Sequence, residues 1–160
     1  MRKAVYTGSF DPITLGHLNI VERSSRIVDE LVVGIGSNIE KQGLFEPEER
    51  LELVQRCTSK LNNVTVTCFE GLAVDFVESC GAKVMIRGVR PLTDIAAEIT
   101  MTMANRRLND DLETIFLMAD GEYAHVSSSL IKQISPLADD KQLARFVPAE
   151  IIPDLRKKLG

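Results

Sequence analysis

The sequence KAVYTGSFDPITLGH, residues 3–17, combines a short strand, a tight loop and the start of a helix. Ala4–Tyr6 is a short segment of apolar, β-branched and aromatic residues, which favours a buried strand. Gly8 lets the backbone turn sharply, and Gly16 leaves room for a phosphate directly before His17. His17 falls in the first helical turn, where free amides and the helix dipole favour an anion. This unit predicts a phosphate site at the end of the first strand.

Short apolar segments of the same kind alternate along the chain with segments of helical spacing. Strands are predicted over Ala4–Tyr6, Leu31–Ile35, Val64–Phe69, Val84–Ile86 and Thr114–Met118. Helices are predicted over 18–28, 47–57, 73–80, 95–108 and from Ser127 or Ser128 to Ile134. Strands that are mostly apolar rather than alternating indicate a sheet covered on both faces. The order predicts right-handed crossovers and a Rossmann-like, doubly wound α/β sheet of five parallel strands with helices on both faces.

Glycine and proline set the expected ends of several elements. Gly81 is expected to end the third helix and Pro136 the fifth. Residues 141–159 form a helical C-terminal extension, which Pro148 and Pro153 are expected to interrupt. Because the 160 residues contain no linker and no repeat, we expect a single domain over residues 1–160.

The composition excludes several classes of protein. Hydrophobic residues make up 44% and charged residues 26% of the chain, which is typical of a globular rather than a disordered protein. The balance of 19 Lys and Arg against 23 Asp and Glu gives a net charge of −4. That charge argues against a general binder of nucleic acid or of anionic membranes. The three cysteines lack the spacing of a metal site, and no signal peptide or membrane span is visible, so we expect a cytoplasmic protein.

Unusual polar residues follow four of the predicted strands. They occupy residues 7–17, 36–45, 87–94 and 120–129. Because ligands of such sheets bind beyond the carboxyl ends of the strands, these segments are expected to form one site. Lys41 suits a point contact with an anion, and Arg87 and Arg90 offer forks that match phosphate oxygens. An ion pair of these arginines with Asp94 or Glu98 is the structural alternative.

Three consecutive serines, residues 127–129, stand at a predicted helix start. One serine is enough for a cap, so three indicate donors for a polyphosphate. His125 has no acid or base partner nearby in sequence and is interpreted as packing at the start of that helix. No P-loop motif occurs, and Ile39 stands where a dinucleotide-binding loop needs its third glycine.

The first of these segments carries a resemblance to a known superfamily. Residues 8–12, Gly-Ser-Phe-Asp-Pro, and residues 14–17, Thr-x-Gly-His, resemble the signature of nucleotidyltransferases with the (T/H)xGH motif. That superfamily transfers a nucleotidyl group from a nucleoside triphosphate and releases pyrophosphate. Residues 86–90, Ile-Arg-Gly-Val-Arg, and residues 127–132, Ser-Ser-Ser-Leu-Ile-Lys, narrow the resemblance to the bacterial phosphopantetheine adenylyltransferases. The likeness covers essentially the whole chain.

The resemblance implies a reaction in which ATP and 4′-phosphopantetheine give dephospho-coenzyme A and pyrophosphate by direct in-line displacement, with Mg²⁺. It implies that His17 stabilises the transition state, with Lys41 and Arg90 as further catalytic cations. Phosphopantetheine is then held by Ser9, Lys41, Ala73 and Arg87. The implied ATP site contains Ser9, Phe10, His17, Gly88, Val89, Arg90, Glu98, Tyr123, Ala124, His125, Val126, Ser127, Ser128 and Ser129. A homohexamer and coenzyme A as a feedback ligand are also implied, and no residue is assigned to the metal.

Two positions depart from that family. Ala97 and Ala73 stand where a Tyr and a Met are frequent, which alters the packing of the pantetheine arm. Two alternative functions remain open at this point. One is another adenylyl- or cytidylyltransferase, for example one acting on nicotinate mononucleotide. The other is a catalytically silent nucleotide-binding regulator, against which His17 and Lys41 argue.

Overall fold

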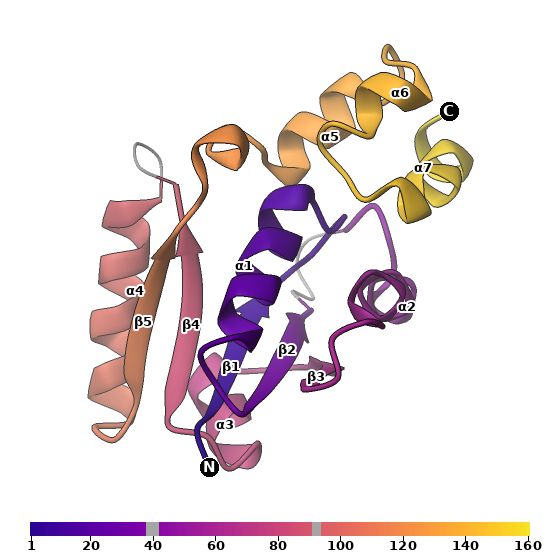
Figure 1. The fold of residues 1–160 in the computed structure, drawn as a ribbon. Helices are drawn as coiled ribbons and strands as arrows, with labels where there is room; N and C mark the ends of the chain where they lie inside the picture. Colours follow the sequence, from indigo (N-terminus) through magenta and orange to yellow (C-terminus); the bar gives the residue numbers. More distant parts are fainter. Residues whose placement is uncertain (38–41, 91–93) are drawn as a thin grey trace.

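A parallel sheet forms the middle layer of the fold in the computed structural model, which describes residues 1–37, 42–90 and 94–160 (Figure 1). Its strands are β1 (Lys3–Gly8), β2 (Glu30–Gly36), β3 (Val64–Phe69), β4 (Val84–Val89) and β5 (Glu113–Met118). They pair in the order β3-β2-β1-β4-β5, and every pairing is parallel. The predicted doubly wound sheet of five parallel strands is confirmed.

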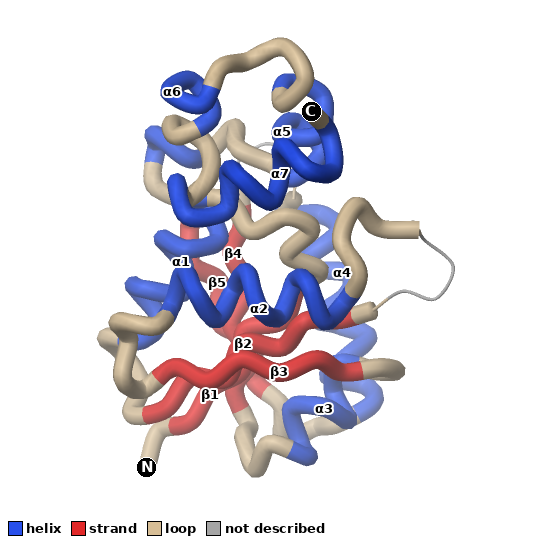
Figure 2. Tube along the Cα trace, turned by 90° about the vertical axis from the view of Figure 1, so that its right-hand side faces the viewer, coloured by secondary structure: helices blue, strands red, loops and turns tan. Residues whose placement is uncertain are grey.

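Helices cover both faces of this sheet. Those that precede β5 are α1 (Leu15–Ser25), α2 (Pro47–Thr58), α3 (Ala73–Ser79) and α4 (Ile95–Leu108). After β5 follow the 3₁₀ turn η1 (Gly121–Tyr123), α5 (Ser128–Ile134), α6 (Asp140–Leu143), the 3₁₀ turn η2 (Ala149–Ile151) and α7 (Ile152–Leu159). The view in Figure 2 shows α2 on one side of the strands and α3 on the other. No helix in the described part of the chain is long and apolar enough to cross a lipid bilayer.

The two faces of β1 belong to two different hydrophobic clusters. Ala4 and Tyr6 pack in the larger cluster with side chains of α1 and α2. Val5 points the opposite way, because side chains alternate along a strand, and packs with Val74 and Val77 of α3. Burial on both faces explains why the central residues of β1 and β2 are mostly apolar.

The edge strand β5 departs from the expectation that both faces of the sheet are covered. Ile115 and Phe116 point to opposite faces, and both side chains are exposed in the single chain. Among the described residues, β5 pairs only with β4 and forms an edge of the sheet. The expectation that both faces are covered is therefore wrong for this strand in the single chain.

Helix ends follow the predicted signals closely. Gly81 follows α3 with φ +69, and its N–H donates to the Glu78 carbonyl at 2.9 Å. This left-handed conformation costs glycine no side-chain clash. The Ser127 hydroxyl caps α5 by accepting from the Leu130 N–H at 3.1 Å. Both predictions are confirmed.

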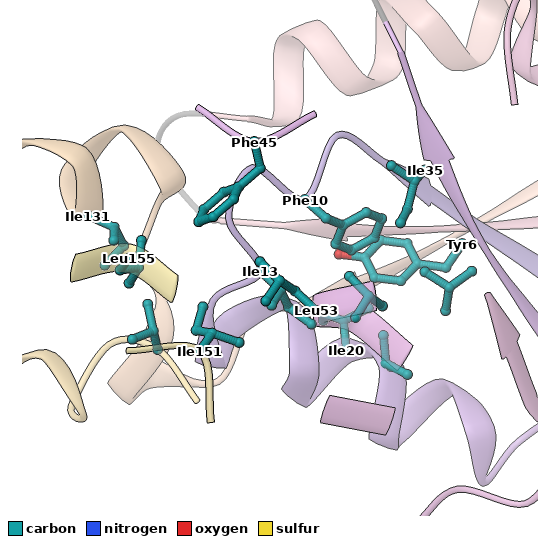
Figure 3. Close-up of a cluster of buried hydrophobic side chains, with 14 of the residues drawn as sticks. Tyr6, Phe10, Ile13, Ile20, Ile35, Phe45, Leu53, Ile131, Ile151 and Leu155 are labelled. Atoms are coloured by element: carbon teal, nitrogen blue, oxygen red, sulfur yellow. The ribbon is translucent and has the colours of Figure 1, made fainter. Parts of the chain in front are cut away.

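The C-terminal extension packs on the carboxyl end of the sheet (Figure 1). Figure 3 shows the larger cluster continuing from Tyr6 and Ile35 of the sheet to Ile131 and Leu155 of α5 and α7. The expectation that Pro153 interrupts a helix is wrong. Pro153 lies in the first turn of α7, where a helix has no use for the missing N–H.

Candidate active site

A cavity of about 330 Å³ opens at the carboxyl edge of the sheet, between β1 and β4. β1 pairs with β2 on one side and with β4 on the other, so the strand order switches here. Open α/β sheets bind their ligands at such switch points, and the volume suits a small-molecule site. The wall is formed by Tyr6–Ser9, Thr14, Gly16, His17, Ile20, Arg87–Arg90, Asp94, Glu98, Ala119, Tyr123 and Val126–Ser129.

Most of the site residues predicted from the sequence meet in this cavity. They are Ser9, His17, Arg87, Gly88, Val89, Arg90, Glu98, Tyr123, Val126, Ser127, Ser128 and Ser129. Ala73, Ala124 and His125 are not part of the wall. Lys41 lies outside the described residues. Segments distant in sequence are thus brought together, while their individual roles stay predictions.

The His17 imidazole is oriented by the start of α1. The Thr14 N–H donates to His17 Nδ1 at 3.1 Å, and the His17 N–H donates to Thr14 Oγ1 at 3.2 Å. This reciprocal capping box fixes the ring at the third helical position. Because Nδ1 accepts a hydrogen bond, a neutral ring carries its proton on Nε2. His17 can therefore donate from Nε2 into the cavity that it lines.

Burial of the ring keeps His17 neutral. Burial, together with the smaller effect of the positive charges of Arg87 and Arg90, lowers the pKa of His17 from its ordinary value of 6.5 to about 4. An imidazole with this pKa carries no charge near neutral pH. The side chain is consequently suited to hydrogen-bond donation rather than to proton transfer.

Phe10 supports His17 from the core. Its side chain is buried and is not part of the cavity wall, although the sequence places it in the ATP site. The ring contacts His17 edge-on at a centroid distance of 4.9 Å. The Phe10 ring also meets the Tyr6 ring edge-on at 5.3 Å (Figure 3). Phe10 has φ +49, a conformation that is uncommon for a residue with a side chain. The turn after β1 is therefore held in an unusual backbone geometry.

Two arginines at the end of β4 are each paired with an acid of the α4 region. Arg87 donates from Nε and Nη2 to the Glu98 carboxylate at 3.0 and 2.7 Å, and from Nη1 to the Thr7 carbonyl. Arg90 donates from Nε and Nη2 to Asp94 at 2.8 and 2.9 Å. The ion-pair alternative is thus realised. Both guanidinium groups still line the cavity, where a phosphate can reach them.

The serines after β5 have structural partners that the sequence did not reveal. Ser127 caps α5, and the Ser128 hydroxyl donates to the Pro12 carbonyl at 2.9 Å. This second bond ties α5 to the loop that precedes α1. His125 packs its ring edge-on against Phe146 at 6.1 Å, which agrees with its interpretation as a packing residue. Ala73 begins α3 and packs against the smaller hydrophobic cluster.

Sequence reasoning missed Asp11 as an organising residue. Its buried carboxylate accepts from the backbone N–H groups of Leu44 and Phe45, each at 2.8 Å. Lys132 Nζ approaches the same carboxylate at 3.3 Å. An acid inside a glycine- and proline-rich loop is the only signal in the sequence, and it does not reveal a partner more than thirty residues away.

Comparison with known proteins places this cavity in a class. The sequence profile of the family described as Cytidylyltransferase-like matches residues 5–134, most of the chain. A solved structure from Vibrio parahaemolyticus, a nicotinate-nucleotide adenylyltransferase candidate, has the same fold. It superposes with a TM-score of 0.73 at 17% identity, covering 99% of this chain and 95% of that one. The fold and the matched family define the chain as a nucleotidyltransferase.

Closer relatives identify the branch of that class. The chain is 66% identical over 158 residues to phosphopantetheine adenylyltransferase of Rhodopirellula baltica. The matched residues cover 98% of this chain and 88% of that protein. The chain is also 45% identical over 160 residues to phosphopantetheine adenylyltransferase of Clostridium botulinum, covering 100% and 96%. The chain belongs to the phosphopantetheine adenylyltransferase family.

Proposed function

We propose that this chain transfers the adenylyl group of ATP to 4′-phosphopantetheine, giving dephospho-coenzyme A and pyrophosphate, by direct in-line displacement in the His17 cavity. Membership of the family supports the reaction. The observation that carries the site is the meeting of a neutral, oriented histidine with Arg87 and Arg90 at one sheet edge. The alternative substrate nicotinate mononucleotide has only the distant fold likeness in its favour.

The mechanism needs positioning and charge stabilisation rather than a covalent intermediate. A phosphate oxygen of phosphopantetheine attacks the α-phosphorus of ATP, and negative charge grows on the equatorial oxygens and on the leaving pyrophosphate. His17 donates from Nε2 to an α-phosphate oxygen, a bond that strengthens as that oxygen gains charge. The Arg87 and Arg90 forks hold phosphate oxygens and align the two reactants.

Mg²⁺ fits this site as an ion carried by the phosphates. The cavity acids Asp94 and Glu98 are both engaged with arginines. Within the described ranges, no group of three His, Cys, Asp or Glu side chains could hold a metal. Magnesium is often bound through substrate phosphates with few protein ligands, and there it would neutralise phosphate charge.

Self-association is the second part of the proposal. α4 exposes Met101 and Met103 by 59% and 66%, and β5 exposes Phe116 by 37%. Apolar side chains gathered on one surface are typical of a subunit interface. We propose a hexamer of about six times 17.7 kDa. Light scattering at micromolar concentration should show that mass, and a monomer would contradict it.

We further propose that coenzyme A binds as a feedback ligand, because it contains the phosphopantetheine arm of the substrate. Competition of coenzyme A against phosphopantetheine would test this. The three cysteines are free, as is typical of a protein of the reducing cytoplasm, where we propose that the chain works.

Pyrophosphate release tests the reaction directly. The chain is incubated with ATP and Mg²⁺, alone and with added 4′-phosphopantetheine or nicotinate mononucleotide. We expect pyrophosphate only with phosphopantetheine, together with a product of the mass of dephospho-coenzyme A. Release with nicotinate mononucleotide would instead support the other adenylyltransferase. No release with either acceptor would favour a silent nucleotide-binding protein.

A further inference from the structure

Arg50 is a buried cation close to the active-site edge, although it is not part of the cavity wall. It lies in the first turns of α2 and is 7% exposed. Its guanidinium donates from Nη1 to the Ser9 carbonyl at 2.9 Å and to the Gly36 carbonyl at 3.3 Å. Nε donates to the Phe45 carbonyl at 3.1 Å. One side chain thus joins three separate segments of backbone.

The position is an unfavourable one for an arginine. The helix dipole disfavours a cation near a helix N-terminus, and burial of a charge costs free energy unless partners compensate for it. In the part of the chain that the structure describes, no carboxylate lies within ion-pair distance of Arg50. Backbone carbonyls are its only described partners. The arginine is therefore best explained by the segments that it connects.

Those segments surround the cavity edge. Ser9 lines the cavity, and the next residue, Phe10, has the positive φ and the ring that supports His17. Gly36 ends β2. Phe45 is held twice, because its N–H donates to Asp11 and its carbonyl accepts from Arg50. The turn after β1 is thereby fixed against the neighbouring strand and the start of α2. Its unusual backbone geometry needs such outside support.

We propose that Arg50 is a positioning residue of the adenylyl-transfer site, acting through the turn that carries Ser9. The proposal rests on the proposed function. Its guanidinium holds the Ser9 carbonyl, so that the Ser9 side chain and the Phe10 ring keep their places beside the substrate phosphate and His17. Arg50 itself does not touch a reactant, because it is not part of the cavity wall.

The test uses Arg50→Met, which keeps much of the length and removes every donor, and Arg50→Lys, which keeps the charge without the fork. Arg56→Met is the matched control, since Arg56 lies on the same helix with an exposed ion pair to Asp154. Amide hydrogen exchange of the full-length chain without substrates reports order in residues 8–11. We expect faster exchange there in Arg50→Met, an intermediate rate in Arg50→Lys, and the wild-type rate in Arg56→Met.

Kinetics then separate positioning from general stability. At a temperature well below the melting transition, Arg50→Met should lower kcat/KM for phosphopantetheine at least tenfold. In a Ser9→Ala background the same change should have an effect at least threefold smaller, because both act through one turn. Arg50→Lys is expected to keep part of the kcat/KM that Arg50→Met loses. If Arg50→Met does not fold, the kcat/KM of Arg50→Lys tests the positioning role instead.

Three results would overturn the proposal: unchanged exchange in residues 8–11, kcat/KM within twofold of wild type, or losses that multiply independently with Ser9→Ala. If the wild-type chain released no pyrophosphate, the proposed function would fail. The exchange measurement would still show whether Arg50 orders the turn, so the two failures are distinguishable.

Discussion

Replacing His17 with alanine should slow turnover while leaving ATP binding nearly intact. The structure gives the ring one outward donor, Nε2–H, because Nδ1 is occupied by the Thr14 N–H. The loss of one donor that acts mainly in the transition state costs about 10²–10³ in kcat, or about 2.7–4 kcal/mol. The Michaelis constant for ATP should change by much less, since the bond strengthens only as charge develops.

The same substitution has a predictable effect on stability. Thr14 loses the acceptor of its N–H but keeps its own capping bond to the N–H of residue 17, and the loss of one hydrogen bond costs about 0.5–1.5 kcal/mol. The dependence of stability on pH should also differ between the wild type and His17→Ala. The folded pKa of His17, about 4, lies below its ordinary value of 6.5, so the unfolded chain binds more protons between these values. The contribution of His17 to stability is therefore complete above pH 6.5 and is lost as the pH falls toward 4.

The size of that pH effect follows from the pKa difference. Moving from 6.5 to about 4 corresponds to at most about 3 kcal/mol, at about 1.36 kcal/mol per pKa unit. Solvent that reaches the ring through the open cavity reduces this value. Denaturant titrations at several pH values give the free energy of unfolding at each pH. Between pH 4 and 6.5 this free energy should rise less steeply with pH in His17→Ala than in the wild type. His125→Ala is the control for this slope, because its ring is exposed.

Steady-state kinetics in both directions, run beside a thermal melt, decide the case. A His17→Ala variant with near-normal kcat would refute the donor role. A variant that melts cooperatively but shows the wild-type slope of stability between pH 4 and 6.5 would refute the argument that His17 is held neutral by burial.

Three further outcomes are expected. Arg87→Ala should raise the Michaelis constant for phosphopantetheine more than that for ATP, because a charge-assisted phosphate contact is worth about 1.5–3 kcal/mol. Steady-state kinetics measure the two Michaelis constants separately, and equal increases in both would contradict the prediction. Gly88→Ala should lower the stability to denaturant by about 1–3 kcal/mol, because its Cβ would lie 2.8 Å from Ile20 Cγ1 in a packed core. Arg156→Ala should destabilise the C-terminal extension, since Arg156 donates to three backbone carbonyls and one carboxylate, whereas exposed Lys157→Ala should shift the melting temperature little.

Local signals made most of the fold predictable from the sequence. Apolar runs located all five strands, and α4 has the predicted bounds because residues 95–108 keep helical spacing up to Asn109. Gly81 ends α3 because glycine adopts the left-handed conformation at no cost. Pro153 misled, because the same residue breaks a helix in its interior and favours one in its first turn.

The site was predictable where strand ends gather residues, and not where partners come from distant segments. A parallel sheet brings the residues after its strands to one edge, so Ser9, His17 and Arg87 meet as expected. The contacts of Asp11 with Leu44 and of Arg50 with Ser9 depend on packing between helix, loop and strand. No periodicity in a single sequence encodes such contacts.

The ion pairs at β4 reconcile the two interpretations that the sequence left open for its arginines. Asp94 and Glu98 stand four residues apart at the start of α4, so they share one helix face and each takes one arginine. Carboxylates are favourable at a helix N-terminus, which lets α4 carry both acids. The pairs dock α4 against the end of β4 and hold the guanidinium planes at the cavity. The helix that bears the exposed methionines is thus fixed to the cavity by the two arginines that line it. One element, α4, therefore connects the proposed subunit interface with the proposed chemistry.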